Sequence, residues 1–168
     1  DPSNIIWNTE TGRVQLIDFG NASILPHEPL KLTVANLLEK NLVYMAPEQT
    51  GFTNRDIDGR TDYYSLGIVL YQMLSGVLPI KGDHAKDILR FKIEKNLESS
   101  LIMNSNIPEA LLSIILTLIA KNPEDRYQSA RGIKFDLEKC INSLKTTGKI
   151  EPFPIKVQDI SNRFAIPK

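Results

Sequence analysis

Two short apolar runs at the start of the chain carry the residue types that can hold a metal ion. Asp18-Phe19-Gly20 follows the apolar residues 14–17, and Asn4 opens the earlier run, 4–7. The polar cluster at 8–12 separates the runs and predicts an antiparallel hairpin. The start of one strand then lies beside the end of the other, so Asn4 and Asp18 are expected to face one site. An amide oxygen and a carboxylate form a weak, water-rich Mg²⁺ site of the kind that nucleotide phosphates complete.

Asp18 also has a simpler interpretation, as a side chain that caps a turn. A tripeptide motif alone does not decide between the two, so its context matters. Residues 21–43 contain two prolines and no sustained period, which predicts a long surface loop. Ala46-Pro47-Glu48 follows that loop, and two more polar motifs lie further along, at residues 62–67 (Asp-Tyr-Tyr-Ser-Leu-Gly) and 121–127 (Lys-Asn-Pro-Glu-Asp-Arg-Tyr).

Apolar residues at helical spacing predict a mostly helical body behind these motifs. The first helix begins near Thr61, is apolar on nearly all sides and ends at Gly76, so it is expected to be central. The last 20 residues, 149–168, hold three prolines and no apolar face, which predicts an extended linker. The predicted apolar faces of the four helices are Leu66, Val69, Leu70, Met73 and Leu74; Ala85, Ile88, Leu89 and Ile93; Leu111, Leu112, Ile115, Leu118 and Ile119; and Ile133, Leu137, Cys140, Ile141 and Leu144.

Composition excludes several classes of function. The 168 residues include 20 Lys plus Arg and 20 Asp plus Glu, so the net charge of zero gives no electrostatic case for nucleic acid. The apolar stretches fall well short of the roughly 20 residues that a membrane span needs. The single cysteine, Cys140, cannot form an internal disulfide, which fits a reducing compartment and a cytoplasmic location.

In this order and at these spacings, the motifs resemble the signature set of eukaryotic-type Ser/Thr protein kinases: the catalytic-loop Asn, the Asp-Phe-Gly and the Ala-Pro-Glu. Residues 62–67 are similar to the Asp-x-Trp-Ser-Leu-Gly segment of kinases, and residues 121–127 to the Asp-Pro-x-x-Arg segment before the last kinase helix. The resemblance covers roughly residues 1–145. It implies a protein-kinase-like fold, α+β as a family but mostly α here. Only the C-terminal lobe is expected, a β-hairpin plus a helical bundle without the N-terminal lobe.

A narrower resemblance concerns the parent protein. Residues 1–7, 44–51 and 158–164 are similar to the kinase module of bacterial, cyanobacterial-type multidomain proteins. In those proteins an AAA-type ATPase, a GAF sensor and often a sensor histidine kinase follow the kinase module. This resemblance makes residues 146–168 a linker toward a downstream domain. The implied partners are a protein substrate, ATP, the missing N-lobe and the downstream domains of the parent chain.

The resemblance also assigns the nucleotide site. It makes Asn4 and Asp18 the catalytic residues that coordinate the Mg²⁺ ions bridging the phosphates of ATP. Ile6 would lie under the adenine ring, and Ile17 would line the pocket just before Asp18. For these two isoleucines, plain hydrophobic core is the alternative interpretation.

Structural and regulatory roles follow from the same resemblance. Phe19 would pack into the regulatory core of the kinase, and Gly20 belongs to the start of the activation segment. Glu48 and Arg126 would form a buried ion pair that ties the end of this segment to the helices; two unrelated surface charges are the alternative. Asp62 would accept hydrogen bonds from the catalytic-loop backbone, a role compatible with a plain helix N-cap.

Departures from the family pattern leave three functions open. The catalytic Asp of His-Arg-Asp-x-x-x-x-Asn would lie five residues before Asn4, ahead of residue 1. Asp1 stands where Ser/Thr kinases usually carry a Lys that contacts the transferred phosphate, and Lys40-Asn41 replaces the usual Gly-Thr before the substrate-positioning loop. An active Ser/Thr kinase domain, a pseudokinase or docking module, and a truncated fragment are the alternatives. The fragment alone is expected to be inactive because half of the nucleotide cleft is missing.

Overall fold

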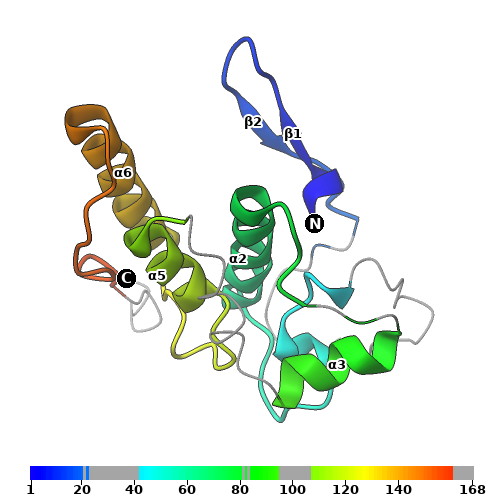
Figure 1. The fold of residues 1–168 in the computed structure, drawn as a ribbon. Coiled ribbons are helices and arrows are strands. Elements are labelled where there is room, and N and C mark those ends of the chain that lie inside the picture. The colour runs from blue at the N-terminus through cyan, green and yellow to red at the C-terminus, as the bar shows by residue number, and fades with distance from the viewer. Residues whose placement is uncertain (21, 23–41, 81, 83, 95–106, 161–168) are drawn as a thin grey trace, which may run out of the picture.

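A short hairpin projects from a body of helices in this protein (Figure 1). The structure is a computed structural model that describes residues 1–20, 22, 42–80, 82, 84–94 and 107–160. Most of the predicted loop at 21–43, including Lys40 and Asn41, and the last residues, 161–168, lie outside the described residues. The described elements are η1 (Pro2–Asn4), β1 (Ile5–Trp7), β2 (Val14–Leu16), η3 (Pro47–Thr50), α2 (Arg60–Ser75), α3 (Ala85–Glu94), α5 (Glu109–Leu118) and α6 (Ala130–Thr147).

The predicted hairpin is confirmed. β1 pairs antiparallel with β2, with Ile5 opposite Leu16 and Trp7 opposite Val14. Its turn forms because the Asn8 side chain accepts hydrogen bonds from the Glu10 and Thr11 amides. Gly12 adopts a φ of 69°, which glycine tolerates without strain. The apolar side chains remain uncovered, with Trp7 65% exposed. The hairpin is therefore held together mainly by the backbone hydrogen bonds between its strands, and its stability is marginal by itself.

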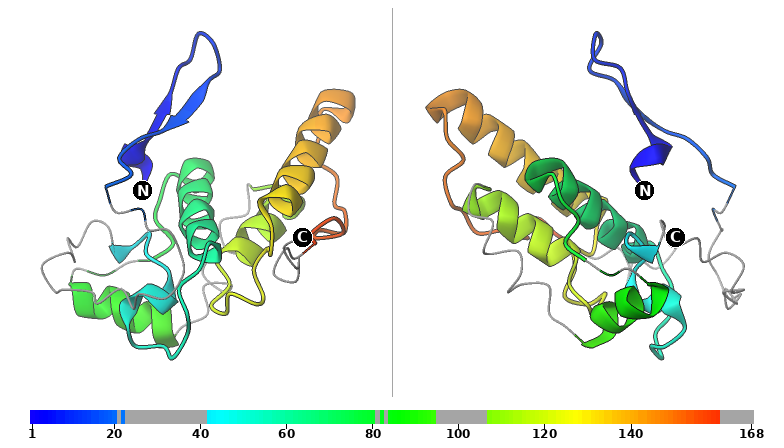
Figure 2. Two further views of the ribbon diagram at one scale, coloured as in Figure 1. Left: turned by 180° about the vertical axis from the view of Figure 1, so that it is seen from behind. Right: turned by 45° about the vertical axis from the view of Figure 1, so that its right-hand side comes forward.

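Helix α2 lies between two hydrophobic cores, as its apolar character predicted (Figures 1 and 2). On one side it packs with α3 and the segment before η3, and on the other with α5 and α6. Gly76 ends α2 in the left-handed conformation, with φ 73°. The first core comprises Leu42, Val43, Ala46, Tyr64, Ile68, Tyr71, Ile80, Ile88, Ile115 and Ile119, and the second Ala110, Ile114, Leu118, Tyr127, Ile133 and Cys140.

The helix faces differ from the predicted ones toward the helix ends. Met73, in the last turn of α2, is 74% exposed. Ile141 and Leu144 are half exposed because the C-terminal part of α6 extends past α5 (Figure 1). In α3 the expected core residue Ile93 is 40% exposed, while its neighbour Lys92 is buried. Periodicity alone assigns a lysine to solvent, and only a set of buried acceptors reverses that assignment.

The chain after α6 folds back onto the helices. Gly148 ends α6, and Ile150, Phe153 and Ile155 then pack against the second core. Asp159 reaches the loop before α6, where its carboxylate accepts hydrogen bonds from the Gln128 and Ser129 amides at 2.8 and 2.9 Å. The segment 149–160 has no helix or strand, as predicted, but its packing fixes it to the body. Among the described helices, none has the length and apolar character needed to cross a bilayer.

The crossing of α2 and α5 depends on Gly67. A Cβ added there would lie 2.6 Å from Ile119 Cγ2 and 2.8 Å from Leu118 Cβ. We expect Gly67→Ala to lower the free energy of unfolding by about 1–2 kcal/mol, because overpacking outweighs the helix propensity gained by alanine. Urea unfolding monitored by circular dichroism measures the change.

Gly59, at the N-cap of the same helix, provides the matched control. An added Cβ at Gly59 meets nothing within 4 Å, and φ is −58°. Gly59→Ala should leave the free energy of unfolding unchanged or raise it by up to about 1 kcal/mol. Equal stability of the two variants would contradict the proposed close packing at Gly67.

Candidate functional site

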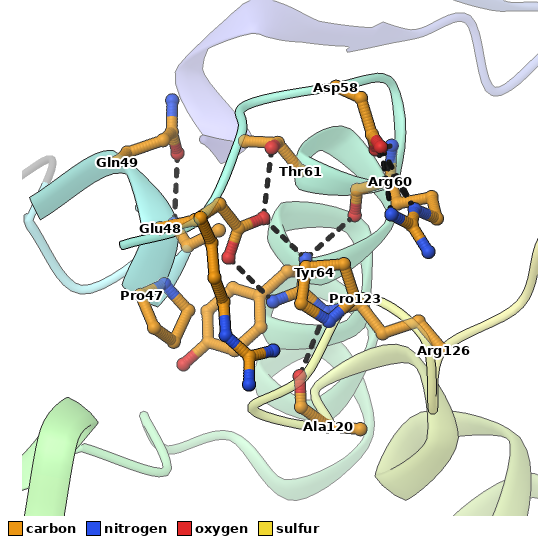
Figure 3. Close-up of polar contacts among 12 residues, drawn as sticks. Pro47, Glu48, Gln49, Asp58, Arg60, Thr61, Tyr64, Ala120, Pro123 and Arg126 are labelled. Atoms are coloured by element: carbon orange, nitrogen blue, oxygen red, sulfur yellow. Dashed lines mark hydrogen bonds and ion pairs between the residues drawn. The ribbon is translucent and has the colours of Figure 1, made fainter. Parts of the chain in front are cut away.

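A buried ion pair joins η3 to the loop before α6 (Figure 3). Arg126 Nη1 donates to Glu48 Oε1 at 2.6 Å, and Nη2 donates to Oε2 at 2.8 Å. The two side chains are 0% and 1% exposed. This contact, which the sequence predicts, excludes the interpretation of Glu48 and Arg126 as unrelated surface charges.

Every remaining polar atom of the pair has a partner. Arg126 also donates to the backbone carbonyls of Ala120 at 2.8 Å and Arg60 at 3.0 Å. Glu48 Oε1 accepts a further hydrogen bond from Thr61 Oγ1 at 2.9 Å. Such complete satisfaction is what lets two charges remain buried. The pair therefore connects η3, the start of α2 and the loop after α5.

The aromatic ring of Tyr64 packs against Arg126 in this site. Its ring centroid lies 5.0 Å from the Arg126 guanidinium carbon, in cation–π contact. Complete burial raises the pKa of the Tyr64 hydroxyl well above its usual value; the charge of Glu48 adds to this effect and that of Arg126 opposes it. Tyr64 therefore remains neutral and supplies an aromatic face rather than a charge.

A second arginine, which the sequence analysis missed, braces the start of α2. Arg60 is buried and pairs with Asp58, with 2.9 Å between Arg60 Nη2 and Asp58 Oδ2. Arg60 Nη1 donates to Gln128 Oε1 at 2.9 Å, and Nη2 also donates to Glu124 Oε1 at 3.3 Å. No local motif distinguishes Arg60 from a surface arginine, because its partners Gln128 and Glu124 are more than 60 residues away.

The hairpin brings Asn4 and Asp18 to the same open end. The Ile17 amide donates to the Asn4 carbonyl at 3.0 Å, which places Asp18 one residue beyond the pair. Asp18 has a φ of 59°, a left-handed conformation uncommon outside glycine. Its carboxylate also accepts a long hydrogen bond, 3.4 Å, from the Gly20 amide. The turn-capping interpretation of Asp18 is therefore compatible with the geometry, and it leaves oxygen lone pairs available for a cation.

The apolar residues around this end are not in either core. Ile6 and Ile17 are about half exposed, so the alternative that made them plain core residues is wrong for the described chain. Phe19 is 67% exposed, and the expected packing into a core is not found among the described residues. The hairpin projects away from the described helices (Figure 2).

Asp62, in the first turn of α2, lies near the start of the chain. Partial burial raises the pKa of its carboxyl. This proximity fits the predicted position of Asp62 beside the catalytic-loop segment. The hydrogen bonds expected from that backbone to Asp62 stay a prediction.

Comparisons with known proteins agree with this geometry. The family model for the protein kinase domain matches residues 1–136. This chain belongs to the protein kinase family. The fold and family expected from the motifs are thereby confirmed, and the Glu48–Arg126 pair lies within the matched region.

Individual relatives show what share of a longer protein the chain matches. It is 39% identical over 138 residues to a probable serine/threonine-protein kinase of Clostridium perfringens, covering 82% of this chain and 19% of that protein. It is 38% identical over 95 residues to a hybrid signal transduction histidine kinase of Dictyostelium discoideum, covering 56% and 3%. The chain thus spans a fifth or less of either relative.

A solved structure supports the fold independently. The twitchin kinase region from Caenorhabditis elegans superposes with a TM-score of 0.61 and 25% sequence identity, covering 95% of this chain and 25% of that one. Kinase membership at the level of the family follows from the sequence and the structure together.

Removing one partner of the buried pair should strand the other charge. We expect Glu48→Gln to lower the free energy of unfolding by about 3–5 kcal/mol, because Arg126 keeps its charge without a carboxylate. Glu94→Gln is the control, since Glu94 pairs with Arg90 on the surface of α3 at 2.8 Å. That change should cost no more than about 0.5 kcal/mol. Similar losses in the two variants, measured by urea unfolding, would show that the Glu48–Arg126 pair is not energetically special.

Proposed function

We propose that this chain is the C-terminal lobe of a Ser/Thr protein kinase that transfers the γ-phosphate of Mg-ATP to protein hydroxyls. The placement of Asn4 and Asp18 at the open end of the hairpin carries the proposal. The Ile17–Asn4 hydrogen bond of 3.0 Å fixes their spacing, and the left-handed turn at Asp18 re-aims the chain just after β2. The Ser/Thr kinase named among the relatives supports the same chemistry.

The donor set suits Mg²⁺ completed by a nucleotide. An amide oxygen and a carboxylate are both hard oxygen ligands, the class that Mg²⁺ prefers. Among the described residues, no group of three or more His, Cys, Asp or Glu side chains is placed to hold a metal ion. The remaining ligands would then be water and phosphate oxygens, and the bound ion would neutralise charge on the transferred phosphoryl group.

The exposed isoleucines fit a nucleotide pocket that a second lobe completes. Ile6 lies on β1, which begins just after Asn4, and Ile17 lies between the end of β2 and Asp18; both are about half exposed. We assign them to the adenine side of the pocket. The N-terminal lobe of the parent protein would cover them, along with Phe19. The chain by itself is then expected to lack phosphotransfer activity, since the catalytic Asp is assigned to a position five residues before Asn4, ahead of Asp1.

A pseudokinase or docking module is the second candidate, and the contacts of Asp1 favour it. The Asp1 carboxylate caps η1 by accepting hydrogen bonds from the Ser3 amide at 2.8 Å and from the Ser3 hydroxyl. It therefore offers no cation to a phosphate at the position where the family usually carries a Lys. Calorimetry of the parent protein with Mg-ATP separates the candidates: tight binding without turnover supports the second one.

The parent protein is proposed to be a multidomain signalling protein. The Dictyostelium relative is named a hybrid signal transduction histidine kinase, and the match to this chain covers 3% of its length. We accordingly propose that residues 1–145 form the lobe and that residues 146–168 lead toward a downstream domain. The single cysteine, Cys140, is buried and has a raised thiol pKa owing chiefly to burial, which fits an inert thiol in a cytoplasmic protein.

Asp18 provides the direct test of phosphotransfer. In the full-length protein that contains this chain, Asp18→Ala should reduce transfer of labelled γ-phosphate to a peptide library by about a hundredfold or more, because a metal ligand is lost. Glu10→Ala, which removes an exposed carboxylate from the turn of the same hairpin, should leave the rate unchanged. Equal transfer by native protein and Asp18→Ala would refute the proposed kinase activity.

A further inference from the structure

Lys92 of α3 is a buried lysine that the nucleotide site does not use. Its side chain is 2% exposed, and its ammonium nitrogen lies 4.8 Å from the centroid of the Tyr64 ring. It donates to the backbone carbonyls of Val43 at 2.8 Å and Met45 at 2.5 Å, and to the Tyr64 hydroxyl at 3.4 Å. Lysine is seldom fully buried, so this arrangement needs a specific explanation.

The acceptors belong to the segment that leads into Ala46-Pro47-Glu48. Three successive carbonyls there are bound by side chains of the surrounding helices: Lys92 takes those of Val43 and Met45, and Ser65 Oγ donates to that of Tyr44 at 2.8 Å. The Ala46 amide donates to Gln49 Oε1 at 2.9 Å. Side chains therefore supply hydrogen bonds that regular secondary structure would otherwise provide.

The environment of Lys92 does not supply a direct counter-ion among the described residues. Burial, followed by the charge of Arg126, lowers the pKa of Lys92 to about 7, and the charge of Glu48 opposes this shift. The groups facing it are thus Glu48 from η3, Tyr64 from α2 and Arg126 from the loop before α6. A neutral amine still has two N–H donors, enough for the Val43 and Met45 carbonyls. The contact consequently depends on hydrogen bonding rather than on charge pairing.

We propose that Lys92 is a positioning residue for the protein substrate, because it fixes the backbone of residues 43–45 against α3. This inference rests on the proposed kinase function, in which the residues before Ala46-Pro47-Glu48 form the substrate-positioning loop. Lys92 is too deeply buried to touch a substrate itself. It acts through the carbonyls it holds, so its loss should change the binding of the phosphate acceptor and leave the binding of ATP unaffected.

Lys92→Met in the full-length protein tests the proposal, because methionine keeps an unbranched chain without donors. We expect the KM for a Ser/Thr peptide library to rise about tenfold through the loss of buried hydrogen bonds, with the KM for ATP within about twofold of wild type. Lys121→Met is the matched control. Lys121 also donates to a backbone carbonyl, that of Ile93 at 2.9 Å, but does not contact residues 43–45. The control should leave both constants unchanged, and an unchanged peptide KM in Lys92→Met would overturn the proposal.

Amide hydrogen exchange provides a readout that does not need activity. Exchange across residues 42–46 should be at least about tenfold faster in Lys92→Met, while the amides of α6 retain their protection. Unchanged exchange across 42–46 overturns the proposal whatever the kinetics. If wild-type protein transfers no phosphate but the exchange increases, the proposed function has failed, and only the fixing of residues 43–45 by Lys92 is supported.

A second variant covers the case in which Lys92→Met does not fold. Lys92→Gln keeps an uncharged N–H donor on a shorter side chain, and it should be folded by circular dichroism. We expect exchange across residues 42–46 to rise in this variant as well, by less than in Lys92→Met. No rise in folded Lys92→Gln would contradict the proposal.

Discussion

The buried pair of Glu48 and Arg126 is the constraint around which the described structure is arranged. When two opposite charges are removed from water, the cost of desolvation is offset only if they pair with each other and every remaining donor and acceptor is hydrogen-bonded. Otherwise the buried pair destabilises the fold. Here the requirement is met by Thr61, by backbone carbonyls of Arg60 and Ala120, and by the ring of Tyr64 beneath. As a result, the pair holds η3, the first turn of α2 and the loop after α5 together.

This arrangement also explains why the segment before η3 can be irregular and still be fixed. Pro47 starts η3, and the ion pair with Arg126 holds Glu48 in place. The C-terminal end of the segment that begins at Val43 is therefore fixed. Lys92 and Ser65 then bind its carbonyls from two different helices. A loop held in this way keeps its shape without strand neighbours.

Much of the architecture could be predicted because it depends on local patterns. The turn at residues 8–12, the apolar run of α2 and the glycines at 76 and 148 each act within a few residues, and each element appears where the sequence predicts it. The Glu48–Arg126 contact was accessible only through the resemblance, since 78 residues separate its members. The burial of Arg60 and Lys92 could not be predicted from the sequence, because the acceptors that allow a cation to be buried are brought to it only by the tertiary structure. The exposure of Phe19 was also unforeseen, because a sequence does not show on which side of a hairpin other elements lie.

The segment after α6 has a consequence for where the folding unit ends. The kinase family model stops at residue 136, inside α6, yet Asp136 itself binds the Tyr127 hydroxyl at 2.6 Å and the Lys156 amide at 2.8 Å. Asp159 packs closely against Gly132: a Cβ added to Gly132 would lie 2.6 Å from Asp159 Oδ1. The absence of a side chain at Gly132 therefore makes room for Asp159. Residues 149–160 thus complete the second core and cap its loop. The packed body of the described chain therefore extends past α6 to residue 160, beyond the end of the family match, so removal of residues 149–160 would expose part of the second core.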